Sequence, residues 1–194
     1  ADGAWGGIQP PWVYSLIALW LLGDRLDADG PLSKGFAGFY GPEGFAIDDG
    51  IQFHLQSCLS PVWDTGLAAM ALEDAGVPGD HPALVKAGNW LVDEQIESGG
   101  DWLVRCSAAP GGWAFEFQND VYPDTDDSAI VLLALTKMDL DTARKADAVE
   151  HGTRWLVGMQ SRGGGWGAFD RNNTQTWTRD IPFADFGEMI DPPS

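Results

Sequence analysis

Three carboxylates fall within four residues at Asp124-Thr125-Asp126-Asp127, directly after an aromatic-rich stretch that runs from Gly111 to Phe117. Acids favour water and large aromatic residues favour burial, so the combination indicates a strong acid in an apolar cavity. Carboxylates that crowd together cannot all ionise, and one proton therefore stays on the cluster. Such a site suits a reaction that begins with protonation and continues through cations, because aromatic faces stabilise cations without attacking them.

The same motif also has a purely structural interpretation. Pro123 precedes it and an apolar stretch follows it, so the acids could cap a helix and place negative charge in its first turn. Both interpretations can hold, because capping fixes the geometry of the carboxylates. A Ca²⁺ or Mg²⁺ site is not expected, since the ligand spacing and the glycine of an EF-hand are absent. We predict neither a metal nor a cofactor.

Helical periodicity with proline starts and glycine stops organises most of the chain. It predicts helices at Trp12–Leu22, Leu32–Tyr40, Val62–Ala75, Pro82–Glu97, Asp126–Met138 and Thr142–Met159. No segment combines the sustained alternation of a strand with hairpin turns. The sequence therefore predicts an all-α fold.

Two of these helices end in a repeated sequence element. Its first copy comprises Trp90-Leu91-Val92, Gln95 and Gly100-Asp101-Trp102, and its second comprises Trp155-Leu156-Val157, Gln160 and Gly164-Gly165-Trp166. We expect the Gln amide to bond backbone groups that a neighbouring helix end leaves unpaired, and the Trp ring to fill the joint between helices. Each repeat has room for two helices and their loops, and stacked helix pairs are typical of an α/α barrel or solenoid.

Composition excludes several partners. The formal net charge is −18, from 29 acidic and 11 basic residues, so nucleic acid is not expected, because phosphate binding needs clustered Lys and Arg. No basic patch supports attraction to anionic lipid, so any membrane contact would be hydrophobic.

Two cysteines, Cys58 and Cys106, are too few for a disulfide scaffold. The longest apolar run, Pro11 to Leu22, is too short to span a bilayer.

The repeat and the acid motif together resemble the squalene–hopene cyclases, a family of class II triterpene cyclases. The family's repeat reads basic-Gly, an aromatic, Gln and Gly-x-Trp. Lys86 to Trp102 match it with Ala87 in the Gly position, and His151 takes the basic position of the copy that runs from Gly152 to Trp166. Asp124–Asp127 match the family's Asp-x-Asp-Asp motif. Further similar stretches are Trp5–Trp12, Ser60–Thr65 and Ile181–Gly187.

The resemblance implies an all-α fold of two α/α barrels (toroids) that enclose a large apolar cavity. Residues 1–55 would form the end of one barrel domain, and residues 56–194 the central part of the catalytic barrel domain with the Asp-x-Asp-Asp motif. The chain starts without Met and stops at Asp191-Pro192-Pro193-Ser194, a helix-start signal, so we expect an internal piece of a longer protein. The isolated segment should be inactive and prone to aggregate, because missing helices expose apolar faces.

The resemblance also implies roles for individual residues. Asp126, the middle acid, would donate the proton, and Asp124 and Asp127 would support it with hydrogen bonds. A His partner of the family would follow Ser194. The residues that would stabilise cations are Trp63, Phe115 and Phe169; those that would position water near the last cation are Gln9, Pro10 and Tyr14; and those of a channel constriction are Phe183 and Ala184, with Ala184 where Cys is common.

The implied activity is the cyclisation of squalene, or a similar polyprene, to hopene and hopanol. The complete protein would lie peripherally on the cytoplasmic side of a bacterial membrane, with membrane contacts largely outside this chain, and a homodimer is compatible with the resemblance. Three alternatives stay open: a related class II cyclase that acts on another polyprene, a non-catalytic α/α-repeat scaffold, and an α/α-barrel glycosidase with paired carboxylates. Oxidosqualene cyclases are disfavoured, because their acid motif lacks the doubled Asp ending. A diphosphate substrate is not expected either, because the chain has no basic cluster.

Overall fold

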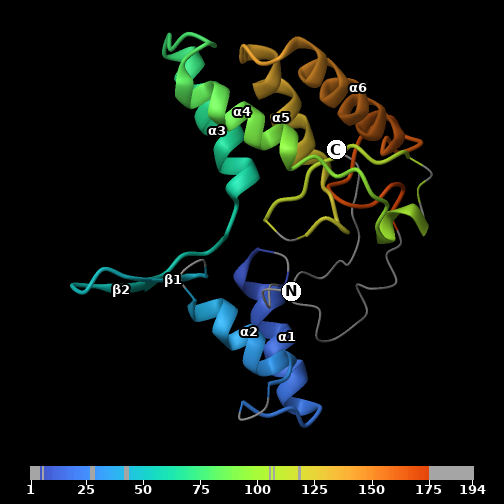
Figure 1. Cartoon of the computed structure of the whole chain (residues 1–194). Helices are drawn as coiled ribbons and strands as arrows, with labels where there is room; N and C mark the ends of the chain where they lie inside the picture. Colours follow the sequence, from blue (N-terminus) through green and yellow to red (C-terminus); the bar gives the residue numbers. More distant parts are fainter. Residues whose placement is uncertain are drawn as a thin grey trace. The chain divides into compact units, whose positions relative to one another are not determined.

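The structure is a computed structural model that describes residues 5, 7–26, 29–41, 44–104, 106, 108–117 and 119–174. Helices dominate this part of the chain, with one small hairpin between α2 and α3 (Figure 1). The elements are α1 (Gln9–Leu21), α2 (Pro31–Tyr40), β1 (Ala46–Asp48), β2 (Phe53–Leu55), α3 (Pro61–Asp74), α4 (Pro82–Asp93), a 3-10 helix (Asp101–Val104), α5 (Thr125–Lys137) and α6 (Thr142–Gly158). All six predicted helices are present.

Proline and glycine explain where the helices begin and end. The first helix starts at Gln9 rather than at Trp12, because Pro10 and Pro11 fit the first turn, where no intrahelical N–H is needed. Beyond the end of α3, Gly76 adopts a φ of +91°, a conformation that favours glycine. Helix α4 ends at Asp93, earlier than the predicted Glu97.

The hairpin β1–β2 was not expected from the sequence. It pairs Ala46 with Leu55, Ile47 with His54 and Asp48 with Phe53. Three residues per strand are too few to show the alternation that marks a strand in a sequence. The turn is held by Asp49, whose Oδ1 accepts hydrogen bonds from the backbone N–H groups of Ile51 and Gln52.

The chain divides into two compact units. The first contains residues 1–61 and 115–119. Trp12 is at the centre of its core: the ring lies edge-on to Phe45 with centroids 5.1 Å apart, and Nε1 donates to the Gly35 carbonyl at 3.0 Å. The buried core side chains of this unit are Trp12, Leu16, Leu32, Phe39 and Phe45.

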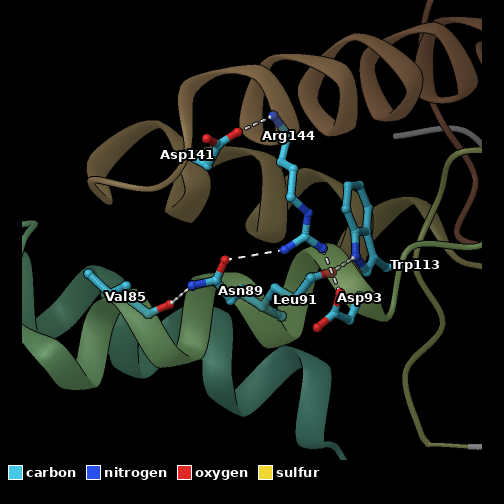
Figure 2. A network of polar contacts seen from close by, with 7 residues as sticks. All are labelled: Val85, Asn89, Leu91, Asp93, Trp113, Asp141 and Arg144. Atoms are coloured by element: carbon cyan, nitrogen blue, oxygen red, sulfur yellow. Dashed lines mark hydrogen bonds and ion pairs between the residues drawn. The ribbon is translucent and has the colours of Figure 1, made fainter.

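The second unit contains residues 62–114 and 120–194, with helices α3 to α6. Their inward faces meet in one core, made by Val62, Ala69, Leu84, Leu91, Trp113, Val131, Ala134, Leu135, Met138 and Ala148. Helices α4 and α6 are also joined by polar contacts, as Figure 2 shows. Arg144 on α6 donates to Asp93 at 2.6 Å and to Asn89 at 3.4 Å, both on α4.

Hydrogen bonds at the ends of α4 and α6 show how the repeat works. Gln95 Nε2 donates to the Gly111 carbonyl at 2.7 Å, and Gln160 Nε2 donates to the Gly164 carbonyl at 2.6 Å. The next backbone N–H groups, of Ile96 and Ser161, donate to the carbonyls of Gly112 and Gly165. Each copy therefore folds its glycine turn back onto the end of its own helix.

The tryptophan of each copy completes this arrangement. Trp113 Nε1 donates to the Leu91 carbonyl and Trp166 Nε1 to the Leu156 carbonyl, both at 2.6 Å (Figure 2 shows the first bond). These carbonyls lie in the last turns of α4 and α6, where a helix leaves acceptors without intrahelical partners. The indoles thus cap the C-terminal ends of the two helices.

This pattern corrects the repeat alignment predicted from the sequence. The structure matches Trp166 to Trp113 and not to Trp102, and residues 97–110 form an insertion within the first copy. The insertion packs on α6, because Trp102 lies edge-on to Trp155 at 6.3 Å between ring centroids. Gln95 also donates to Ala148 at 2.9 Å, inside α6 rather than at the predicted helix end.

Among the described residues, no helix has both the length and the apolar character needed to cross a membrane.

Candidate active site

The acid motif forms the N-terminal turn of α5. Asp124 is the N-cap residue, and its Oδ1 accepts a hydrogen bond from the Asp127 backbone N–H at 2.7 Å. The Asp124 carbonyl accepts from Ser128 Oγ at 2.7 Å, and the same Oγ accepts from the Trp113 backbone N–H at 2.9 Å. The Asp124 N–H donates to the Trp113 carbonyl at 3.0 Å. The motif is therefore a helix cap, and capping holds its carboxylates in fixed places.

Burial distinguishes the three acids. Asp124 is 4% exposed and Asp127 is 2% exposed, whereas Asp126 is an exposed residue. The two outer acids of the motif therefore lie inside the protein, and the middle acid is the one exposed to solvent.

Burial also places a proton on the motif. It raises the pKa of Asp127 to about 9, with further contributions from the hydrogen bond to Asp124 and from the negative charges of Asp124, Asp126 and Asp64. Burial also raises the pKa of Asp124, although its hydrogen bonds with Asp127 oppose that effect. At neutral pH, Asp127 is consequently protonated and donates to Asp124, because two buried charges in contact are much more costly than one.

One oxygen of Asp127 has no hydrogen-bond partner among the described residues. This atom, Oδ1, is fully buried. A charged carboxylate would leave it unpaired in an apolar environment, which is a second reason for Asp127 to stay neutral.

Two of the predicted aromatic residues are connected to this turn through a neighbouring residue. Trp63, half-buried on α3, directly precedes Asp64, whose charge is close enough to raise the pKa of Asp127. The Phe169 ring stacks on Tyr122 with centroids 5.1 Å apart and an interplanar angle of 25°. Tyr122 immediately precedes Pro123 and the motif, so this stack places Phe169 beside the segment that leads into the acid turn.

The remaining predicted site residues belong to the first unit or fall outside the described residues. Gln9, Pro10 and Tyr14 are on α1 in the first unit, where Gln9 Nε2 donates to the Gln56 carbonyl at 2.7 Å, and Pro10 and Tyr14 are exposed. Phe115, in the same unit, is half-buried beside Gly7, whose φ is +64°. Phe183 and Ala184 lie outside the described residues.

Sequence reasoning missed three residues that shape the site: Tyr122, Thr125 and Ser128. Tyr122 stacks on Phe169, Thr125 bonds the segment just before Phe169, and Ser128 ties the cap to Trp113. Residue type alone gives no signal for these contacts, because each partner is distant in the sequence. Among the described residues, no group of three or more His, Cys, Asp or Glu side chains could hold a metal ion.

Comparison with known proteins identifies the chain's relatives. Residues 59–194 match the squalene–hopene cyclase C-terminal domain. The chain is 53% identical to a squalene–hopene cyclase of Alicyclobacillus acidocaldarius, over all of this chain and 30% of that protein. It is 42% identical to enfumafungin synthase of Hormonema carpetanum, over 98% of this chain and 14% of that protein. It is 41% identical to dammaradiene synthase of Dryopteris crassirhizoma, over 96% of this chain and 27% of that protein.

The chain thus spans less than a third of the length of these relatives. The matched domain is of the α/α-barrel type, and together with the helix-rich architecture it confirms the predicted fold class. The family match and the similarity over all of this chain agree with the buried acid motif and its aromatic neighbours. The chain belongs to the squalene–hopene cyclase family.

Proposed function

We propose that the complete protein cyclises squalene to pentacyclic hopanoids by protonating a terminal double bond. The observation that carries this proposal is the acid turn of α5, where two buried acids, Asp124 and Asp127, lie beside an exposed third acid, Asp126. Relatives named squalene–hopene cyclase support the substrate and the product class.

In this proposal Asp126 is the proton donor. Its O–H bond breaks, the proton bonds to the terminal alkene carbon, and a tertiary cation forms on the neighbouring carbon. Asp124 and Asp127 support the donor, because their shared proton keeps the charge of the motif low.

The cation then propagates as each remaining double bond supplies the electron pair for a new C–C bond. We assign the aromatic rings of Trp63, Phe115 and Phe169 to the stabilisation of these cations, because a ring face attracts a cation without bonding to it. At the far end, we assign Gln9, Pro10 and Tyr14 to the water that removes a proton, giving hopene, or adds to the last cation, giving hopanol. Phe183 and Ala184 would line the substrate entrance.

We further propose that residues 1–55 belong to one barrel domain and residues 56–194 to the catalytic one. The complete protein would act as a peripheral protein on the cytoplasmic side of a bacterial membrane, where squalene is dissolved, and would bind no cofactor. Its membrane contacts would lie largely outside this chain, and it would form a homodimer. Co-sedimentation with liposomes and the mass in detergent solution test these two points, and a monomer that stays in the supernatant would contradict both.

Substitution of Asp126 by Asn tests the proton donor. An amide cannot supply the proton, so Asp126→Asn in the complete protein should lower cyclic product from squalene by at least about a hundredfold. Gas chromatography with mass spectrometry measures the products, and the thermal unfolding midpoint shows whether the fold is retained. The matched control is Asp120→Asn, which removes an exposed acid outside the motif. Undiminished product formation by Asp126→Asn would sink the assignment.

A second candidate is a triterpene cyclase that forms another product. The similarity to dammaradiene synthase supports it, because one family contains enzymes with different product names. The product spectrum of the same assay distinguishes the two candidates, and a protein with no polyprene turnover would be the non-catalytic scaffold.

A further inference from the structure

The residue between the first two acids of the motif makes contacts that no role has yet explained. Thr125 is the first residue of α5 and is 3% exposed. Its backbone N–H donates to the Ala168 carbonyl at 2.8 Å, and its Oγ1 donates to the Gly167 carbonyl at 2.8 Å. The first N–H groups of a helix have no intrahelical partner, so this bond satisfies one that would otherwise be orphaned. Both donors of Thr125 therefore bind two successive carbonyls of a distant segment.

That segment is itself anchored. Gly167 is buried and follows Trp166, whose Nε1 donates to the Leu156 carbonyl of α6 at 2.6 Å. Phe169 follows Ala168 and stacks on Tyr122 at 5.1 Å between ring centroids. Thr125 is thus the link that joins the acid turn to the end of α6 and to the backbone that carries Phe169.

We infer that Thr125 is a positioning residue, whose hydroxyl sets the acids of the motif relative to Phe169. This inference rests on the proposed function, in which Phe169 stabilises a cation and Asp126 donates the proton. Replacing the hydroxyl leaves the buried Gly167 carbonyl without its donor, and one of the two bonds that hold this register is lost. Proton transfer to an alkene depends steeply on geometry, so a small displacement slows it.

Thr125→Val tests the inference in the complete protein. It replaces the hydroxyl by a methyl group, and we expect kcat for squalene to fall about tenfold, equivalent to ~1.4 kcal/mol, with little change in KM. The share of incompletely cyclised products should rise, because Phe169 no longer lies in place beside the cation. A residue that only stabilised the fold would change neither the product spectrum nor kcat measured well below the unfolding midpoint.

Two further variants and one control sharpen the test. Thr125→Ser restores the hydroxyl and should recover most of kcat and the wild-type product spectrum. Thr125→Ala removes the hydroxyl without adding a methyl group, and it serves if the Val variant does not fold. Thr136→Val is the control, because its hydroxyl, on the exposed face of α5, also donates to a carbonyl, that of Leu133 at 2.6 Å. This control should behave as the wild type.

The outcomes separate this inference from the proposed function. A wild-type protein that forms no cyclic product overturns both. A wild-type protein that cyclises squalene while Thr125→Val and Thr125→Ala keep its kcat and products overturns the role of Thr125 alone. Loss of kcat in both hydroxyl-free variants, with recovery in Thr125→Ser, supports it.

Discussion

At the scale of single residues, the acid motif shows how one residue type acquires different properties within one turn. Asp124 and Asp127 are buried and share a proton, whereas Asp126 is exposed. The cause is position on the helix: the cap residue and the third residue of α5 face the core, and the second faces outward. A single helical turn therefore contains a buried pair of acids that retains a proton and, next to this pair, an exposed acid.

The raised pKa of Asp127 makes stability depend on pH. The folded protein retains this proton up to about pH 9, while the unfolded chain loses it near the ordinary value of about 3.9. The folded state therefore binds more protons than the unfolded state between these limits, and stability falls as pH rises, by at most about 1.4 kcal/mol per pH unit. Asp127→Asn cannot titrate, so its unfolding midpoint should fall less steeply from pH 5 to pH 8 than that of the wild type.

Thermal unfolding of the complete protein across this pH range measures the effect. Asp147→Asn, on the exposed face of α6, is the control and should retain the wild-type slope. Parallel curves for Asp127→Asn and the wild type would show that Asp127 is ionised in the folded state.

At the scale of the elements, the repeat caps the C-terminal ends of helices α4 and α6. In each copy a Gln amide holds a glycine carbonyl, and an indole N–H satisfies a carbonyl in the last helical turn. The repeat also gives structure to the acid turn, because Trp113 bonds both Asp124 and Ser128 through its backbone. The packing of α4 and the geometry of the acids thus depend on one residue.

Two buried tryptophans allow this capping bond to be measured. Trp113 is fully buried and donates to Leu91, whereas Trp102 is 4% exposed and its Nε1 has no partner among the described residues. Trp→Phe at either site removes a similar volume, but only Trp113→Phe leaves a carbonyl without its donor. We expect Trp113→Phe to cost about 1–3 kcal/mol more than Trp102→Phe, measured by urea unfolding. Equal losses would show that the indole bond adds nothing to ring packing.

The same elements show what the sequence can and cannot predict. The six helices were predictable because proline and glycine mark their ends and apolar residues mark their faces. The pairing of Trp102 with Trp166 was wrong, because two Gly-x-Trp sequences follow Gln95 and only the bond to Leu91 identifies Trp113 as the equivalent. The acid cluster was visible as a local pattern, whereas the bonds of Thr125 join segments 42 residues apart and leave no local pattern.

At the scale of the whole molecule, the first unit has an apolar surface that none of its described residues covers. A groove of about 370 Å³ is lined by Val13, Leu16, Ile17, Trp20, Leu26, Phe36, Phe39 and Tyr40. Ile17 and Trp20 are each about half exposed there, and Leu21 and Leu22 beside them are more exposed still. A contiguous apolar surface of this kind is unusual on a monomeric soluble protein and normally marks a contact region.

We therefore expect the 194-residue segment, expressed alone, to bind an apolar fluorescent dye, to self-associate and to form no cyclic product. Ile17→Glu places a charge in the groove and should abolish most of the dye fluorescence and the self-association, because a carboxylate is costly to bury against apolar side chains. Val157→Glu is the matched control: Val157 is exposed on α6 in the second unit, outside this groove, so the charge should leave both signals unchanged. Light scattering and dye titration measure the two effects. Squalene turnover by the segment alone would contradict the prediction, because it would show that the segment contains a complete active site. Equal dye binding by the unsubstituted segment, Ile17→Glu and Val157→Glu would show that the groove between α1 and α2 is not the surface that binds the dye.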